Sequence, residues 1–298
     1  MMKKLLLSLT LLITCVCGSE AKNALVVIAH GSPMESWRKP VLNLEEMVRN
    51  KVKAGQLKGI DYVRVALMEY TEPTIASVIK DCEAQGVDSI FALPLFMAPS
   101  SHTEEDLPNI LGQKYNPYVR EELAEEKTEL VKSRTPIVLG PTFYYSNVLE
   151  ESMMARIKSL SKDPANEAVI LLAHGDNERI GFWTNILKNV SKYVKEHSKI
   201  TYTDGRLIEM GHNFNVKLMP LLEKAAQAKK RIIVQGIYLT SDVKRMADHY
   251  KMSEQQAALV KGRGVEIVYS PKGILPASTD LVADWVVEQT KLWLHSAR

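Results

Sequence analysis

The sequence is poor in cysteine, and this scarcity limits the classes of protein that it can encode. Only three cysteines occur in 298 residues. Two of them, Cys15 and Cys17, lie in an apolar segment close to the amino terminus. If that segment is removed, Cys82 has no partner for a disulfide within the chain, so a disulfide-rich fold is excluded. We expect Cys82 to be a small buried hydrophobic residue.

An excess of charge and several signature motifs are also missing. The 38 Lys and Arg residues against 35 Asp and Glu residues give a formal net charge of +3, and no basic run is interleaved with aromatic residues. Both observations argue against a nucleic-acid surface. The chain contains no GxxxxGK(S/T) loop, which argues against an ATP-dependent enzyme, and no GxSxG elbow, which argues against a serine hydrolase.

The sequence has no apolar run long enough to cross a membrane, because residues 5–16 fall short of the roughly 20 residues required. This run follows two lysines and precedes small residues, which is typical of a secretory signal peptide. We expect residues 1–21 to be a signal peptide, and the mature chain to be exported to the periplasm without a transmembrane segment. Acylation of Cys15 or Cys17 stays open as a route to a lipid anchor.

Beyond this segment the sequence repeats itself. The stretch ALVVIAHGSP at residues 24–33 returns as AVILLAHGDN at residues 168–177. An aliphatic run that stops at Gly is typical of a strand buried on both faces of a parallel sheet. Amphipathic stretches, near residues 37–54, 74–85 and 103–127 in the first half, separate such runs and predict βα units. The predicted strands are ALVVIA, YVRVALM, SIFALPLF and PIVLGP, then AVILLA, GRLIEM, RIIVQGIYL and VEIVYSP.

The spacing of the repeated motifs predicts two tandem domains. The offset is 144 residues between the two Ala-His-Gly motifs, and 140 residues between the glutamates that follow each second strand. Such regularity indicates a duplication, with the drift absorbed in the connections. The polar stretch at residues 159–167 is the predicted linker. We therefore predict an α/β fold with two domains, at residues 22–163 and 164–298. Each domain contains a parallel sheet and ends with a helix, and we expect a ligand cleft between the two domains.

Polar side chains follow three strands of the first half. His30 ends the first strand, Glu69 follows the second, and His102 lies in the segment after the third. The carboxyl ends of parallel strands form the edge where ligands bind in open α/β sheets, so we expect these side chains to share one crevice. Two imidazoles and a carboxylate suit a divalent cobalt, nickel, zinc or iron ion. The alternative for each residue alone is a polar side chain that faces solvent.

The second half is an unequal copy. His174 and Glu209 recur, but Lys244 takes the place of His102. A protonated lysine cannot bind a metal, so we expect this half to have lost one ligand and, through Lys244 and Arg245, to bind an anionic group instead. His212 lies close to Glu209 in sequence, and either belongs to this site or is a polar residue that follows a strand.

The segments ALVVIAHGSP, ALMEYTEP and FALPLFMAPSSHTEEDLP resemble the class II chelatases, specifically the sirohydrochlorin cobaltochelatases and their iron-inserting relatives. The resemblance extends over the mature chain as two chelatase-like domains. It implies a four-stranded parallel sheet flanked by helices in each half and a tetrapyrrole in the cleft between them. It also implies that His30 and His102 bind the metal and accept protons, and that Glu69 assists them.

The implied reaction is ATP-independent insertion of Co²⁺, or alternatively Fe²⁺, into a sirohydrochlorin-like tetrapyrrole, as in cobalamin or other tetrapyrrole metabolism. The substrate metal ion would be its only cofactor, and oligomerisation is left open. The alternative function is an exported protein on the same fold that binds haem or metal, or removes the metal. The residues expected to contact the tetrapyrrole are Ser32, Ser101, His174, Glu209, Lys244 and Arg245.

Overall fold

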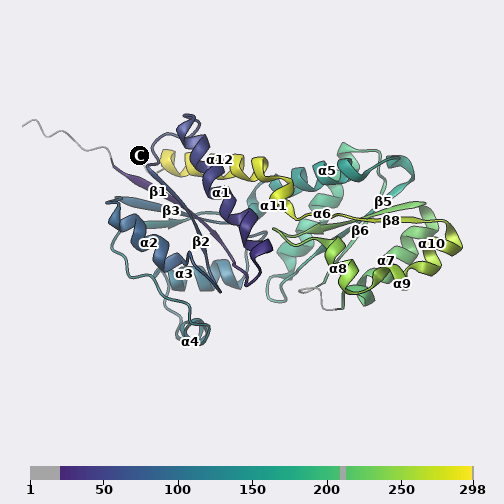
Figure 1. Ribbon diagram of the computed structural model, residues 1–298, viewed down its shortest axis with the longest axis horizontal. Helices are drawn as coiled ribbons and strands as arrows, with labels where there is room; N and C mark the ends of the chain where they lie inside the picture. Colours follow the sequence, from purple (N-terminus) through teal and green to yellow (C-terminus); the bar gives the residue numbers. More distant parts are fainter. Residues whose placement is uncertain (1–20, 209–212, 297–298) are drawn as a thin grey trace, which may run out of the picture.

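Two parallel sheets of four strands form the centre of the fold in the computed structural model, which describes residues 21–208 and 213–296. The strand order is β2-β1-β3-β4 in the first sheet and β6-β5-β7-β8 in the second, so both sheets have one topology (Figure 1). The predicted fold class is therefore confirmed. The strands are β1 (Asn23–Ala29), β2 (Tyr62–Leu67), β3 (Ser89–Pro94), β4 (Ile137–Leu139), β5 (Glu167–Ala173), β6 (Tyr202–Leu207), β7 (Arg231–Ile237) and β8 (Glu266–Tyr269).

Helices cover both faces of each sheet (Figure 1). In the first half, the stretch expected as one helix at residues 103–127 is divided, because Gly112 adopts a φ of +72° and ends the helical path. The helices are α1 (Glu35–Lys53), α2 (Ile75–Ala84), α3 (Leu107–Ile110), α4 (Pro117–Glu125), α5 (Val148–Leu160), α6 (Ile180–His197), α7 (Phe214–Ala228), α8 (Val243–His249), α9 (Met252–Gln255), α10 (Ala257–Arg263), α11 (Ile274–Ala277) and α12 (Thr279–Ser296), with the π-helix η1 (His102–Asp106) and the 3₁₀ turns η2 (Phe143–Tyr145) and η3 (Pro164–Asn166).

The aliphatic runs form the buried central strands. Successive residues of β1 point to opposite faces: Leu25 and Val27 pack into the core beneath α1, whereas Val26 and Ile28 pack into the core beneath α2. Because both faces are covered, every residue from Ala24 to Ala29 is inaccessible to solvent. Cys82 is also fully buried, as predicted, and burial raises the pKa of its thiol to about 12.

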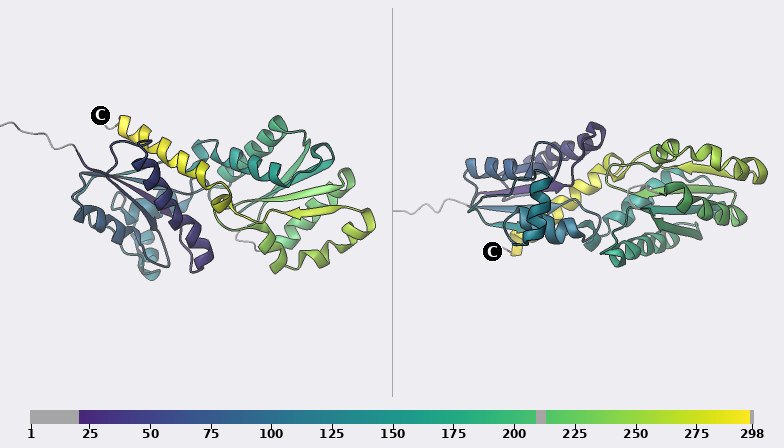
Figure 2. Two further views of the ribbon diagram at one scale, coloured as in Figure 1. Left: turned by 45° about the horizontal axis from the view of Figure 1, so that its top comes forward. Right: turned by 90° about the horizontal axis from the view of Figure 1, so that it is seen from below.

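The last helices of the two halves exchange sheets. Helix α5 leaves the first half and packs on α6 and β7 of the second, whereas α12 returns to pack on α1 and β3 of the first (Figures 1 and 2). Trp293 of α12 stacks on Phe91 of β3, with ring centroids 5.1 Å apart and planes inclined by 6°. The exchanged helices therefore interlock the two sheets. The domain boundary at residues 163 and 164 stays a prediction.

The buried side chain of Arg156 secures the exchanged helix α5. Its guanidinium donates hydrogen bonds to the carbonyl of Gly236 at 3.2 Å, to Oγ of Ser270 at 3.1 Å and to the carbonyl of Lys272. These groups belong to β7 and to the segment after β8. Since an arginine with no partner would be costly to bury, the bonds tie α5 to the second sheet.

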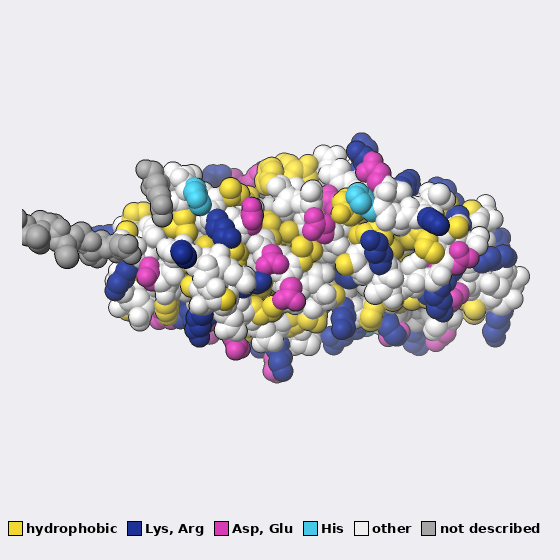
Figure 3. All heavy atoms as spheres, turned by 90° about the horizontal axis from the view of Figure 1, so that it is seen from above, with side chains coloured by type: hydrophobic (Ala, Val, Ile, Leu, Met, Phe, Trp, Pro, Cys, Tyr) yellow, Lys and Arg dark blue, Asp and Glu magenta, His cyan; other side chains and the backbone are white. Residues whose placement is uncertain are grey.

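The carboxyl ends of the two sheets point toward each other at the middle of the molecule (Figures 1 and 2). Side chains that follow β3 and β5 are in contact there, as are side chains that follow β1 and β7. On the face of the molecule shown in Figure 3, acidic and basic side chains are interspersed. Within residues 21–208 and 213–296, no helix has the length and apolarity needed to span a membrane.

Candidate active site

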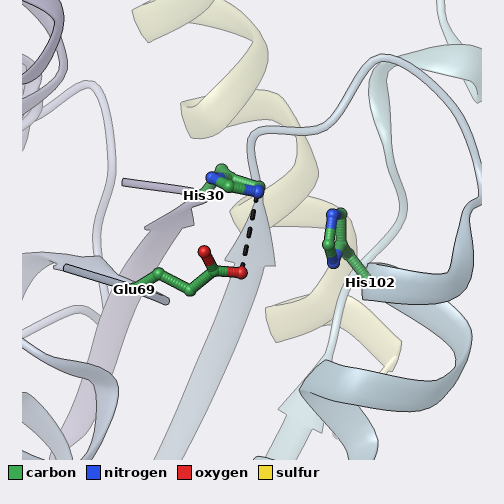
Figure 4. Close-up of side chains that lie close together, drawn as sticks. All are labelled: His30, Glu69 and His102. Atoms are coloured by element: carbon green, nitrogen blue, oxygen red, sulfur yellow. Dashed lines mark ion pairs between the residues drawn. The ribbon is translucent and has the colours of Figure 1, made fainter. Parts of the chain in front are cut away.

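The three expected metal ligands of the first half lie together at the carboxyl edge of its sheet (Figure 4). His30 follows β1, Glu69 follows β2, and His102 begins η1 after β3. One ligand atom from each lies within 4.8 Å of the other two. His30 Nε2 is 3.6 Å from Glu69 Oε1, and the two imidazole centroids are 4.8 Å apart. This group could hold one metal ion, and the roles of its residues stay predictions.

Backbone pairing beyond the strands brings His30 to Glu69. The amide of Glu69 donates a hydrogen bond to the carbonyl of His30 at 2.9 Å, which extends the β1–β2 pairing by one step. Gly31 then turns the chain away at a φ of +102°. A Cβ atom at this position would lie 2.4 Å from the carbonyl oxygen of Glu69, so only glycine allows this approach. The His-Gly pair of the motif is thus a ligand followed by the turn that positions it.

The surroundings of His30 favour a neutral imidazole. Burial lowers the pKa of His30, and the charges of His102 and His174 act in the same direction, while Glu69 opposes them. The Nδ1 atom lies 3.2 Å from the carbonyl of Gly31. When Nδ1 donates its proton to this carbonyl, Nε2 carries a free lone pair beside Glu69. That lone pair can bind a metal ion or accept a proton.

His102 has the opposite tendency because it pairs with Asp106. Burial disfavours its charged form, but the hydrogen bond and charge of Asp106, with help from Glu69 and Glu126, raise the pKa of His102 overall. Its Nδ1 is 2.6 Å from Asp106 Oδ2, one turn along η1. A carboxylate that holds the second nitrogen of a histidine fixes the ring orientation and increases its basicity. Asp106 is not among the site residues predicted above, although its position four residues after His102 was a usable signal.

Aromatic and acidic side chains lie around the two histidines. The rings of Tyr70 and Phe96 lie 6.1 Å and 6.5 Å from the His30 ring, centroid to centroid. Burial, together with the charges of Glu69 and Asp106, raises the pKa of Glu126. Glu126 therefore lies close enough to these two carboxylates to interact with their charges. A cation is attracted to such a group of carboxylates, and a flat apolar ligand can lie against the aromatic rings.

The two serines expected to contact the tetrapyrrole are placed differently. Ser32 is buried in the turn after β1, where its Oγ accepts a hydrogen bond from the amide of Met34 at 3.1 Å and its carbonyl accepts one from Arg38 at 2.8 Å. Ser101 is half-buried and immediately precedes His102. Ser32 therefore shapes the turn, whereas Ser101 lies beside the cluster itself.

The second-half residues that were expected to contact the tetrapyrrole differ in their surroundings. His174 is half-buried after β5, with Nδ1 2.5 Å from the carbonyl of Gly175, and its charge acts on His30. Lys244 is exposed and pairs with Asp248 at 2.9 Å. Arg245 reaches the first half through a contact of 3.4 Å with Ser36. Glu209 and His212, the remaining candidates of this half, lie outside the described residues.

The second half also carries a hollow at the carboxyl ends of β5 and β6. It has a volume of about 560 Å³. Its walls combine the cationic Arg206 and Lys217 with the apolar Ile180 and Val216. In the described part of the chain, His30, Glu69 and His102 are the only group of three or more side chains arranged to hold a metal ion.

The first half of the chain is similar in sequence to known chelatases. The CbiX family model matches residues 24–160. The sirohydrochlorin cobaltochelatase of Methanococcus maripaludis is 39% identical over 89 residues, which are 30% of this chain and 58% of that protein. Its counterpart from Methanocaldococcus jannaschii is 38% identical over 89 residues, with the same coverage. Another from Methanococcoides burtonii is 28% identical over 136 residues, which are 45% of this chain and 94% of that protein.

Solved structures resemble 91% of the chain in fold. The sirohydrochlorin chelatase SirB from Bacillus subtilis subspecies spizizenii, in complex with cobalt, superposes with a TM-score of 0.60 at 12% identity and covers 91% of this chain and 96% of its own. SirB from Bacillus subtilis with Fe³⁺ gives 0.63 at 16% identity and covers 91% and 94%. The chain spans 58% of the first cobaltochelatases that it matches in sequence. Residues 24–160 of this chain are thus similar to the CbiX family, and relatives of this region are sirohydrochlorin cobaltochelatases.

Proposed function

We propose that the protein is a chelatase that inserts a divalent metal ion into a sirohydrochlorin-like tetrapyrrole without ATP, with Co²⁺ as the first candidate metal and Fe²⁺ as the second. The observation that carries this proposal is the convergence of His30, Glu69 and His102 within 4.8 Å at the edge of the sheet. Relatives of the matching half are cobaltochelatases, and similar structures hold cobalt or iron.

The chemistry needs a metal ligand and a proton acceptor on one side of the macrocycle. Insertion removes two pyrrolic protons and requires the metal ion to lose water while it is held over the ring. His30 and Glu69 supply a neutral imidazole and a carboxylate for the metal. His102, made more basic by Asp106, is suited to accept a proton. Asp106 then stabilises the imidazolium that forms.

The edge around the cluster is suited to a flat apolar ring. Large hydrophobic side chains are exposed after three strands: Met34 is 50% exposed after β1, Tyr70 is 63% exposed after β2, and Ile180 is 55% exposed after β5. Exposed apolar groups at a ligand edge are characteristic of a binding surface. His30 and His102 keep about a third of their side-chain surface accessible, so a macrocycle can approach them.

The test is metal insertion by the purified chain. Under anaerobic conditions, sirohydrochlorin and Co²⁺ or Fe²⁺ are mixed with the protein, and the change in macrocycle absorbance is followed. We expect catalysed insertion that His30→Ala abolishes and His295→Ala, an exposed histidine on α12, leaves unchanged. Failure of the wild-type chain to accelerate insertion of either metal would contradict the proposal. Tight haem or metal binding without turnover would instead identify a binding protein.

We also propose that the chain is exported to the periplasm. The support is the pattern of two lysines, an apolar run and small residues at the amino terminus. Fractionation of cells that express the full chain, followed by sequencing of the mature amino terminus, tests this. Mature protein in the periplasm that begins at Lys22 is the expected result. Unprocessed protein confined to the cytoplasm would contradict it.

A further inference from the structure

An ion pair between the two halves lies next to the metal-binding cluster. Arg179 comes from the second half and Glu104 from the first. The Nε and Nη2 atoms of Arg179 are both 2.7 Å from Glu104 Oε2. Glu104 belongs to η1, two residues after His102, and Arg179 lies five residues after His174. The guanidinium is therefore positioned at the flank of the site that the histidines define.

A second contact mirrors this one. Arg245, near the start of α8, lies 3.4 Å from Oγ of Ser36, near the start of α1. Each contact joins the segment after the first strand of one half to the segment after the third strand of the other. The duplicated topology thus produces two related bridges between the halves. In both bridges the arginine comes from the second half.

The backbone at Arg179 is held while its side chain is accessible. Asp176 Oδ1 accepts hydrogen bonds from the amides of Glu178 at 2.8 Å and Arg179 at 3.2 Å, which fixes the turn before α6. The side chains of Arg179 and Glu104 are 33% and 41% exposed. An ion pair this accessible contributes little net stability, because water solvates both partners nearly as well. A ligand carboxylate can therefore replace Glu104 at small cost.

We propose that Arg179 is a substrate-positioning residue that exchanges the carboxylate of Glu104 for a peripheral carboxylate of the tetrapyrrole. This inference rests on the proposed function. A guanidinium forms two parallel hydrogen bonds with a carboxylate, so the side chain that pairs with Glu104 in the free protein has the geometry to bind a carboxylate on the ring. Breaking the pair releases one contact between the halves, and binding the ligand replaces it. Glu104 thus competes with the substrate for Arg179.

The test compares variants of Arg179 and Glu104, which should change the affinity for a tetrapyrrole in opposite directions. The dissociation constant of metal-free uroporphyrin, an octacarboxylate macrocycle, is measured by fluorescence quenching. Arg179→Gln should weaken binding about tenfold, as expected for loss of one charge-assisted contact. Glu104→Gln should tighten binding several-fold, because Arg179 no longer has a competing carboxylate. Lys192→Gln and Glu196→Gln, from an exposed pair on α6, remove the same charges elsewhere and should leave binding unchanged.

Two further measurements separate positioning from a structural role. Arg179→Lys should restore part of the affinity. With sirohydrochlorin and Co²⁺, Arg179→Gln should raise KM while kcat stays close to that of the wild type, because Arg179 does not touch the reacting atoms. If Arg179→Gln and Glu104→Gln change affinity in the same direction, or neither changes it, the pair is only a structural link and the inference is wrong. If the wild-type chain binds no tetrapyrrole, the proposed function itself fails.

Discussion

Single side chains near the cluster determine how its acid–base chemistry depends on pH. Asp106→Asn removes the carboxylate that, against the effect of burial, raises the pKa of His102. Because a protonated His102 cannot accept a pyrrolic proton, insertion by the wild type should slow as the pH falls through this raised pKa. In Asp106→Asn the acid limb of kcat/KM against pH should move to lower pH, and the plateau should fall. Glu105→Gln, on the same π-helix, is the control, and an unmoved limb in Asp106→Asn would contradict the assignment.

The same pair gives a stability prediction with a definite sign. A histidine whose pKa is raised on folding stabilises the fold fully below its ordinary pKa of about 6.5, and this contribution is lost as the pH rises through the folded pKa. His102 is 36% exposed, so solvent weakens the effect. Asp106→Asn should lower the free energy of unfolding by about 0.5–1 kcal/mol at pH 5 and by less at pH 9. Urea titration at both pH values measures this, and a larger loss at pH 9 would refute it.

Gly31 is a residue whose replacement should damage both fold and site. Alanine there would adopt a φ of +102° with its Cβ 2.4 Å from the backbone oxygen of Glu69. We expect Gly31→Ala to destabilise the protein by about 1–3 kcal/mol and to displace Glu69 from His30. Gly181→Ala, which meets nothing within 4 Å in α6, should be neutral or slightly stabilising. Urea denaturation and Co²⁺ titration of both variants test this, and wild-type metal affinity in Gly31→Ala would count against it.

Helices as whole elements show what the sequence could and could not predict. The buried strands and the polar residues at their ends were predictable. An aliphatic run indicates a strand that is buried on both faces, and the His-Gly pair after it marks where the strand ends. The exchange of α5 and α12 was not, since an amphipathic helix shows which face it buries but not against which sheet. The split of residues 103–127 depended on the backbone at Gly112. The Arg179–Glu104 contact depends on how the halves meet, which no local pattern encodes.

The exchanged helix α12 should be a major source of stability for the first sheet. Trp293 is 7% exposed and stacks on Phe91. Trp293→Ala should therefore lower the free energy of unfolding by about 3–5 kcal/mol. Leu292→Ala, at a neighbouring position that is 57% exposed, should cost less than about 1 kcal/mol. Equal losses in the two variants, measured by denaturant unfolding, would show that α12 does not hold the first sheet.

The two sheets share one topology, and in the described part of the chain the metal-binding group lies in the first half. We therefore expect Co²⁺ to bind at His30, Glu69 and His102. His30→Ala and His102→Ala should each abolish this binding, whereas His174→Ala should leave it intact. Isothermal titration with Co²⁺ gives the stoichiometry. Two equivalent sites, or loss of the site in His174→Ala, would mean that the second half also binds the metal.

The return of α12 reverses the order in which the halves can finish folding. Phe91 and the strand around it are made early, but their cover includes Trp293, which is made about 200 residues later. During synthesis, the first sheet must wait with this surface open until α12 has left the ribosome. Helix α5, by contrast, is already made when the second sheet appears. The amino-terminal half, which is synthesised first, is therefore the half that is completed last.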